Sequence, residues 1–398
     1  MDREGLASRL KLAGRIGGLA GHTVVERLRP RRAVHAGDVP RSVAALTVEW
    51  LTAVLCTGHR GARVVGFEVV GGSDGSTSRR AIAVQYNADG VAAGLPDRVF
   101  TKATPGLTSR LITGPSGALA TEVGFYRGVR PALDIEAATS YFAAFDERSC
   151  RSMLLLEDVS VTRDARFGDP VSLAVDRPMA ESMVTQMAAY HAAFWQSPTL
   201  AGLSWLQPAL AWQENVNRML PFERRSLVGF DRAEPVIPPE LRPRKHQIYP
   251  AFMRSLVANA EGPQTFLHSD VHLGNWYVTG AGMGQYDWQC ATKGEWALDV
   301  SYALASALTV KHRQAWERDL LELYLDRLAA GGVADPPSFD DAFMAYRRQV
   351  LHGLVFWLFT IGASRMQPRM QPEHVCLANV ERLAAAAADH ESLAACSG

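Results

Sequence analysis

A short polar segment of the chain has the residue types and spacing of a phosphoryl-transfer site. The segment 268–275 reads His-Ser-Asp-Val-His-Leu-Gly-Asn, and a second carboxylate, Asp287, follows it after a predicted strand, turn and strand. In such sites one carboxylate accepts the proton of the attacking hydroxyl group, while an amide and a second carboxylate bind magnesium. The pattern therefore predicts Asp270 as the base and Asn275 and Asp287 as metal ligands.

The two histidines of this segment allow more than one interpretation. His268 follows a short apolar strand end, and we expect it to brace the loop as structural support. His272 either faces the substrate or packs in the interior. On a strand, His268, Asp270 and His272 would share one face, as in a metal-dependent hydrolase, which is the alternative function. That alternative leaves Gly274 and Asn275 without a role.

A lysine and a glutamate upstream would complete a kinase site. Lys102 ends a short β-rich stretch, and Glu122 lies in the predicted helix 116–129. In kinases a strand lysine reaches the nucleotide phosphates and a glutamate on the following helix positions it. The order of Lys102, Glu122 and the segment 268–275 along the chain favours this interpretation.

A glycine- and hydroxyl-rich stretch, 71–78, precedes Lys102 and is predicted to be a loop between two strands. We expect its hydroxyl residues or their backbone N–H groups to contact phosphates; these are Ser76, Thr77 and Ser78. The same stretch fits the G-x-S-x-G elbow of hydrolases around Ser73, but that elbow needs a helix after the turn. The residues that follow read as a strand, so a hydrolase nucleophile is disfavoured.

Composition excludes some classes of protein. Lys+Arg and Asp+Glu both number 41, so net charge gives no reason to expect nucleic acid binding. The five cysteines are scattered and form no C-x-x-C pair, which favours reduced thiols and a cytoplasmic protein. No motif indicates an oligomeric state.

No integral membrane segment is expected. The longest apolar run, 351–363, is too short to span a bilayer and is predicted to be a buried helix. Residues 1–32 are rich in arginine, and we expect residues 1–40 to form an N-terminal basic extension. The alternative for residues 1–32 is a basic amphipathic segment that makes peripheral contact with an anionic membrane surface.

The order of predicted elements indicates an α+β fold with two lobes. Strands dominate the first part of the chain, and helices dominate the rest, with a small strand-rich insert around 264–288. We expect a small antiparallel-sheet, nucleotide-binding N-lobe at 41–159. A larger helical C-lobe at 160–398 would carry the catalytic loop, the metal site and the substrate-binding helices.

Within this pattern the chain resembles the superfamily of small-molecule kinases that contains aminoglycoside phosphotransferases, choline kinases and ecdysteroid kinase-like proteins. The resemblance covers roughly residues 60–310 and is most specific at 268–277 and 286–289. Three further segments are similar to the ecdysteroid kinase-like branch: 120–126, 154–159 and 190–195. The resemblance implies a two-lobed, protein-kinase-like fold and an enzyme that uses ATP and magnesium to phosphorylate an alcohol group.

The resemblance also implies roles for further residues. Backbone groups near Glu157 and Val159 would receive the adenine, and Asp299 would brace the catalytic loop. The family usually has glycine where this chain has Ser269, so we expect a tighter local backbone there. Protein kinases have arginine at that position and Phe-Gly after the metal-binding aspartate, where this chain has Trp288 and Gln289. A small-molecule hydroxyl substrate is therefore favoured over a protein.

The acceptor is the least determined part of the prediction. A predicted helix that would line the acceptor site carries Phe356, Trp357 and Phe359, which favours a partly apolar alcohol such as a steroid-like or natural-product (including antibiotic) hydroxyl. A non-catalytic nucleotide-binding protein on the same scaffold is a third alternative, although all the expected polar positions are filled.

Overall fold

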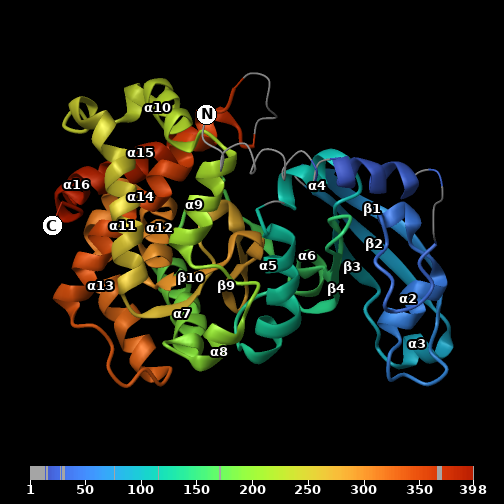
Figure 1. Cartoon of the computed structure of the whole chain (residues 1–398). Coiled ribbons are helices and arrows are strands. Elements are labelled where there is room, and N and C mark those ends of the chain that lie inside the picture. Colours follow the sequence, from blue (N-terminus) through green and yellow to red (C-terminus); the bar gives the residue numbers. More distant parts are fainter. Residues whose placement is uncertain are drawn as a thin grey trace. The chain divides into compact units, whose positions relative to one another are not determined.

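The computed structural model describes residues 14, 17–26, 28, 32–75, 77–114, 116–169, 172–364 and 370–397. The chain forms two compact units (Figure 1). The first contains Met1–Ala132 and Ala138–Asp164, and the second contains Leu133–Ala137 and Ala165–Gly398. The segment Leu133–Ala137 belongs to the second unit although it lies between the two segments of the first. The sequence pattern did not predict this.

The first unit is built on an antiparallel five-stranded sheet of order β1-β2-β3-β5-β4. Its strands are β1 (Val64–Asp74), β2 (Ser78–Tyr86), β3 (Arg98–Ala103), β4 (Ser140–Asp146) and β5 (Arg151–Glu157). Its helices are α2 (Val48–Leu55), α3 (Ala88–Ala92), α4 (Leu107–Thr113), α5 (Ala118–Gly124) and α6 (Val159–Thr162). Helix α2 begins after Thr47, whose hydroxyl accepts from the Trp50 amide at 3.0 Å. The fully buried Trp50 ring meets Phe142 edge-on, with centroids 5.0 Å apart, which joins α2 to the sheet.

The loop predicted at 71–78 is shorter than expected. Strand β1 continues to Asp74 and β2 starts at Ser78, so the stretch of glycines is paired rather than looped. The ladder requires glycine at position 72, because φ there is +154° and a Cβ would lie 2.3 Å from the Arg79 carbonyl oxygen. An ion pair of 2.8 Å between Arg80 and Asp74 closes the hairpin. A strand follows Ser73, as predicted, and not the helix of a hydrolase elbow.

The described part of the N-terminal extension packs on the first unit. Residues 17–26 are helical, and Leu19 and Thr23 are buried. Glu26 lies 2.7 Å from Nη2 of Arg110, a fully buried guanidinium, and 3.3 Å from Nη1 of Arg151. Removing one partner of a buried ion pair leaves an uncompensated charge, so Glu26 ties this helix to the unit. The remainder of the predicted membrane-contact segment 1–32 lies largely outside the described residues.

The second unit is mostly helical. Its strands are β6 (Arg166–Phe167), β7 (Gln264–Leu267), β8 (Trp276–Thr279), β9 (Gly282–Gln285) and β10 (Thr292–Glu295). Its helices are α7 (Arg177–Phe194), α8 (Pro198–Gly202), α9 (Ala209–Met219), α10 (Phe222–Ala233), α11 (Lys245–Glu261), α12 (Ala297–Ala307), α13 (Val310–Ala330), α14 (Phe339–Ile361), α15 (Glu373–Asp389) and α16 (Ser392–Ala395). Helix α14 is the central element, because α10, α11, α12 and α15 all pack against it (Figure 1).

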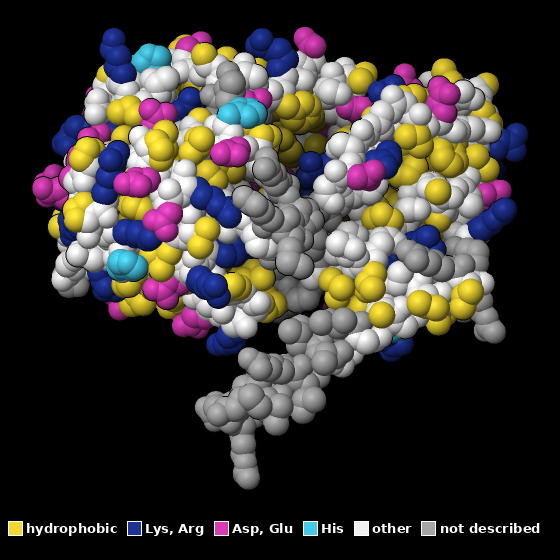
Figure 2. Space-filling model, turned by 90° about the horizontal axis from the view of Figure 1, so that it is seen from above, with side chains coloured by type: hydrophobic (Ala, Val, Ile, Leu, Met, Phe, Trp, Pro, Cys, Tyr) yellow, Lys and Arg dark blue, Asp and Glu magenta, His cyan; other side chains and the backbone are white. Residues whose placement is uncertain are grey.

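The apolar run 351–363 lies mostly in α14 and is largely buried, as predicted. Helix α14 begins after Ser338, whose hydroxyl accepts from the Asp341 amide at 3.2 Å. Among the described residues, no helix combines the length and the apolar character needed to cross a membrane. In the face drawn in Figure 2, cationic and anionic side chains are interspersed over both units.

Candidate active site

The second unit brings the three residues of the predicted phosphoryl-transfer motif to one place. Strand β7 pairs with β10, and the chain leaves β7 into the loop that carries Asp270. Asn275 immediately precedes β8, and Asp287 follows shortly after β9. Because β8 and β9 form a hairpin, both residues lie at the same end of it, and the Tyr286 amide donates to the Asn275 carbonyl at 3.1 Å.

The Asp270 carboxylate is held from two sides. The Asn275 amide nitrogen donates to the Asp270 carbonyl oxygen at 2.7 Å and to Oδ2 at 3.1 Å. The Tyr302 hydroxyl donates to Oδ1 at 3.3 Å. The side chain of Asp270 remains 25% exposed, so part of the carboxylate is open to a bound molecule. Because Asn275 donates through its nitrogen, the amide oxygen is the atom that a cation would bind.

Asp299, on α12, holds the backbone of the same loop. Its two carboxylate oxygens accept from the amides of His268 at 2.7 Å and Ser269 at 2.8 Å, and Oδ2 also accepts from the Tyr190 hydroxyl at 2.9 Å. Burial raises the pKa of Asp299, but hydrogen bonding, from His191 first, outweighs burial and lowers the pKa below its ordinary value. Asp299 thus remains an acceptor for both amides in the fully buried site.

Both ring nitrogens of His268 contact the backbone. Nε2 lies 3.0 Å from the Tyr286 carbonyl oxygen, and Nδ1 accepts from the Asp270 amide at 3.3 Å. The imidazole therefore connects the loop of Asp270 to the residue before Asp287. This bonding does not favour the hydrolase alternative, because neither nitrogen is left for a metal. Within the described ranges, no three histidine, cysteine or acidic side chains are grouped closely enough to hold an ion.

Ser269 adopts a left-handed backbone conformation, with φ of +67°. Glycine tolerates this conformation better than any residue with a Cβ, which accounts for the glycine usual in the family. In this chain the Ser269 hydroxyl hydrogen-bonds the Thr292 hydroxyl at 2.7 Å, and His352 donates to the Ser269 carbonyl at 3.0 Å. These bonds offset the strain of the left-handed residue.

At Ser269 we expect the glycine variant to have a higher free energy of unfolding than the alanine variant, the reverse of the usual order. Ser269→Ala keeps the strain and loses the buried hydroxyl, so we expect a loss of about 2 kcal/mol in the free energy of unfolding. Ser269→Gly also loses the hydroxyl but relieves roughly 1 kcal/mol of strain, so it should be the more stable variant. Urea denaturation measures both. At Ser306, a buried residue inside α12, alanine should instead be about 1 kcal/mol more stable than glycine. The same order at both positions would contradict the role assigned to the strain.

The first unit brings together the predicted lysine and glutamate. Lys102 lies on β3 and Glu122 on α5, and Nζ is 2.8 Å from Oε1. Both side chains are buried, at 7% and 6% exposure. A buried ion pair of this geometry restricts the ammonium group to one position, as a phosphate-binding lysine requires.

Two of the three hairpin residues predicted to contact phosphates lie within the described part of the chain. Ser76 lies outside the described residues. Thr77 is buried, and among the described residues its hydroxyl has no hydrogen-bond partner. Ser78 begins β2, opposite Asp74 of β1 and Ala103 of β3. The phosphate contacts of these three residues stay a prediction.

The proposed adenine segment is anchored by the Glu157 side chain. Arg163 donates to its two carboxylate oxygens at 2.8 and 2.6 Å, Thr162 donates at 2.6 Å and the Thr139 amide at 3.0 Å. Val159 is buried at the start of α6. Burial raises the pKa of Glu157, but these donors outweigh it and bring the pKa to about 2.

This low pKa predicts how Glu157 contributes to stability as pH changes. An acid whose pKa is lowered by folding stabilises the protein above its unfolded pKa, about 4.3, and loses that contribution as pH falls towards 2. Glu157→Gln should lower the free energy of unfolding by about 2 kcal/mol at pH 7, and the difference should shrink below pH 5. Urea denaturation between pH 3 and 7 measures it. Glu147→Gln, at an exposed position, is the control; an equal effect of both would contradict the prediction.

Two contacts of the loop were not found from the sequence. Tyr302 and His352 lie on α12 and α14, far along the chain from Asp270. For Tyr302 a signal existed, because it follows Asp299 by three helical positions and shares its face. His352 stands within an apolar run, and nothing in the pattern distinguishes it from a core histidine.

The three aromatic residues predicted near the acceptor differ in their surroundings. Phe356 stacks on Trp212 at 5.9 Å, and Phe359 stacks on Phe222 at 3.9 Å. Trp357 meets the His272 ring edge-on at 5.1 Å, and His272 Nε2 is 3.8 Å from Asp270. Only Trp357 is thus connected to the catalytic loop by a described ring contact.

A small cavity borders the loop at Ser269. Its volume is about 10 Å³, roughly the space for one water molecule. No acidic residue is among the residues that line it: Ala209, Trp212, Gln213, Leu256, Ser269, Cys290, Thr292, His352 and Phe356.

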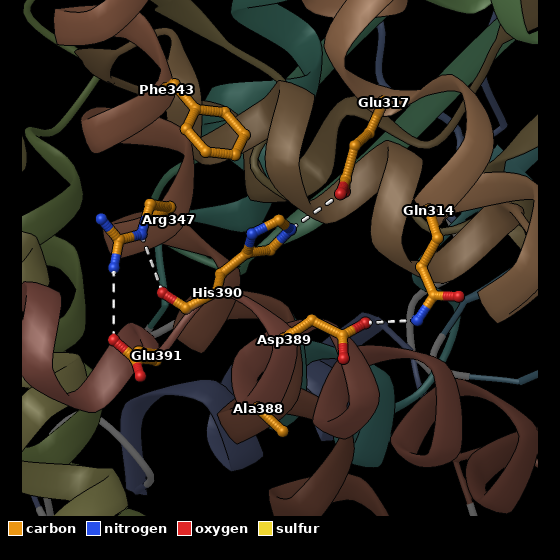
Figure 3. A pocket seen from close by; sticks show the side chains of 8 residues that line it. All are labelled: Gln314, Glu317, Phe343, Arg347, Ala388, Asp389, His390 and Glu391. Carbon is orange, nitrogen blue, oxygen red and sulfur yellow. Dashed lines mark hydrogen bonds and ion pairs between the residues drawn. The ribbon is translucent and has the colours of Figure 1, made fainter.

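A larger hollow of about 480 Å³ lies elsewhere in the second unit (Figure 3). Its side chains are already engaged with one another: Gln314 donates to Asp389 at 2.8 Å, and His390 Nε2 lies 2.9 Å from Glu317. None of the predicted site residues lines it. The network joins α13 to the end of α15, which is a structural role.

A known protein family matches part of the chain in sequence. The sequence profile of the phosphotransferase enzyme family matches residues 137–340, just over half of the chain. No curated protein is a match in sequence. Lys102 and Glu122 lie outside the matched range, so the profile does not bear on them.

Several solved structures align with most of this chain. A putative aminoglycoside phosphotransferase from Ralstonia eutropha has a TM-score of 0.51 and 14% identity, over 86% of this chain and 95% of that one. A choline kinase from Streptococcus pneumoniae has a TM-score of 0.44 and 13% identity, over 82% and 94%. A macrolide 2'-phosphotransferase from Brachybacterium faecium has a TM-score of 0.43 and 16% identity, over 83% and 98%. The first likeness supports the predicted kinase-like fold.

Proposed function

Since the chain belongs to the phosphotransferase enzyme family, we propose that it transfers the γ-phosphate of ATP to a hydroxyl group of a small molecule. The observation that carries this proposal is the meeting of Asp270, Asn275 and Asp287 at one end of the β8–β9 hairpin. The partly exposed Asp270 carboxylate accepts from the Asn275 amide, and the hairpin returns the chain to Asp287 at the same end. Two carboxylates and an amide are the groups that phosphoryl transfer requires.

The proposed reaction assigns a role to each group. Asp270 orients the acceptor hydroxyl and takes its proton while the hydroxyl oxygen bonds to the γ-phosphorus and the bond to the ADP oxygen breaks. Lys102, held by Glu122, binds the nucleotide phosphates. Backbone groups near Glu157 and Val159 receive the adenine, and the hairpin residues Thr77, Ser78 and Ser76 contact the phosphates.

The donor set suits magnesium. Asn275 and Asp287 offer an amide oxygen and a carboxylate, both hard oxygen ligands of the kind that this ion prefers. When bound, the ion neutralises phosphate charge. Asp287 has φ of +66°, a conformation that aspartate adopts more readily than most residues.

Asp287→Ala should therefore weaken nucleotide binding only when magnesium is present. We expect the Kd for ATP with magnesium to rise at least tenfold, while the Kd measured in EDTA changes little. Isothermal titration calorimetry under both conditions measures this. Asp231→Ala, an exposed carboxylate of α10, is the control. An equal loss with and without magnesium would contradict the assignment of Asp287.

We propose a partly apolar alcohol as the acceptor, such as a steroid-like or natural-product hydroxyl. The support is Trp357 of α14, whose ring meets the His272 ring edge-on at 5.1 Å, with His272 next to Asp270. An aminoglycoside is a polycation and would instead favour carboxylates beside the base.

The test is a panel of alcohols with ATP and magnesium, scored by ADP release and product mass. The panel contains steroid-like alcohols, macrolides, choline and aminoglycosides. We expect a phosphorylated product with a neutral, partly apolar member. Exclusive turnover of aminoglycosides would reject the acceptor class, and nucleotide binding without any product would favour the non-catalytic alternative.

A further inference from the structure

Two helices reach the catalytic loop with side chains that no part of the proposed reaction uses. The Tyr302 hydroxyl on α12 donates to Asp270 Oδ1 at 3.3 Å. His352 on α14 contacts the Ser269 carbonyl oxygen through Nε2 at 3.0 Å. One contact acts on the carboxylate of the proposed base, and the other on the peptide group immediately before it.

The surroundings of Tyr302 keep its hydroxyl group as a hydrogen-bond donor to Asp270. Its side chain is only 1% exposed, so the ring cannot rotate away into solvent. Burial, and after it the charge of Asp270, raise the pKa of Tyr302 well above that of an ordinary phenol, so the hydroxyl stays protonated. It lies one helical turn after Asp299, so a single face of α12 holds both the loop backbone and the Asp270 side chain.

His352 is likewise restricted to one role. Its Nε2 must carry the proton, because the Ser269 carbonyl can only accept. Burial lowers the pKa of His352, which favours the neutral ring. The ring packs against Phe356, with centroids 4.4 Å apart, and meets the Tyr302 ring edge-on at 5.7 Å, so two aromatic neighbours restrict its movement.

A glycine permits this arrangement of the two helices. Gly353 follows His352, and a Cβ there would come within 2.5 Å of the Tyr302 ring and 2.9 Å of Leu383. The absence of a side chain at Gly353 is therefore what lets the Tyr302 ring lie where its hydroxyl reaches Asp270.

We propose that Tyr302 and His352 are positioning residues that together set the orientation of the Asp270 carboxylate towards the acceptor hydroxyl. The inference rests on the proposed function of Asp270 as the base. The strained Ser269 backbone makes such support necessary, because a left-handed residue next to the base relaxes unless its surroundings hold it.

Tyr302→Phe should lower kcat by about 10- to 100-fold, the effect of losing one hydrogen bond to a charged group. The Kd for ATP should stay within about twofold. Tyr346→Phe is a matched control, because that buried hydroxyl also donates to a carboxylate, Glu317 at 3.4 Å, away from the loop. It should lose similar thermal stability and keep the wild-type kcat.

His352 is tested by rescue. His352→Phe removes the donor and should lower kcat about tenfold or more, whereas His352→Gln places an amide N–H near Nε2 and should recover much of it.

Gly353→Ala should lower kcat by displacing the Tyr302 ring, although alanine favours helix. Gly202→Ala, where a Cβ would meet nothing within 4 Å, should not.

Hydrogen exchange separates this inference from the proposed function. Tyr302→Phe and His352→Phe should raise amide exchange in the peptide 268–275 above that of Tyr346→Phe. If the wild type turns over an alcohol and Tyr302→Phe retains its kcat, the inference is wrong while the function stands. If no alcohol is turned over, the function fails, and unchanged exchange in 268–275 would still overturn the inference.

Discussion

Asp270→Ala should abolish phosphoryl transfer while leaving the fold and ATP binding nearly intact. Removal of a general base costs about 10²- to 10⁴-fold in rate, so we expect kcat to fall at least 1000-fold once the orientation of the hydroxyl is lost as well. The carboxylate is 25% exposed and Asn275 can still donate to the carbonyl oxygen of residue 270. The Kd for ATP should therefore change less than threefold.

The comparison that decides this prediction uses two more variants. Asp270→Asn keeps the shape and the contact with Tyr302 but cannot accept a proton, so it should be as inactive as the alanine variant. Asp326→Ala removes an exposed carboxylate of α13 and should have the wild-type rate. Product mass and ADP release at saturating acceptor measure kcat. Near-wild-type turnover by Asp270→Asn would show that another group is the base.

The polar motif was predictable because its chemistry depends on local spacing. Asp270 and Asn275 share one loop, and a hairpin returns the chain to Asp287, so the sequence distance and the spatial distance agree. Lys102 and Glu122 were found by their order among the elements, and their contact at 2.8 Å joins β3 to α5, the second helix after it. Short-range order of this kind is visible without knowledge of the tertiary packing.

The contacts that the sequence did not reveal are those made by packing. His352 reaches Ser269 only because the tertiary packing brings α14 to the loop, and an apolar run gives no sign of this polar bond. The hairpin was misjudged for a different reason. Glycines weaken a strand in general, but at Gly72 the cross-strand approach to Arg79 requires one, so the ladder continued where a loop was predicted.

Asp299→Asn should strongly destabilise the second unit. The carboxylate accepts from two amides and the Tyr190 hydroxyl in a site without solvent exposure. An amide has one acceptor oxygen, so its NH₂ group would face a donor and leave at least one buried N–H unpaired. Breaking a buried, charged network in this way costs about 3–5 kcal/mol, or a fall in Tm of roughly 10 °C.

Asp299→Asn should also lower kcat, even in protein that remains folded. Asp299 fixes the amides of His268 and Ser269, and His268 in turn contacts the Tyr286 carbonyl before Asp287, so loss of the carboxylate loosens the base and the proposed metal ligand together. At a temperature where the variant is fully folded, kcat should still fall at least tenfold. Asp319→Asn, a 65% exposed acid of α13, should alter neither Tm nor kcat. A folded Asp299→Asn variant with the wild-type kcat would show that the loop holds its geometry without this brace.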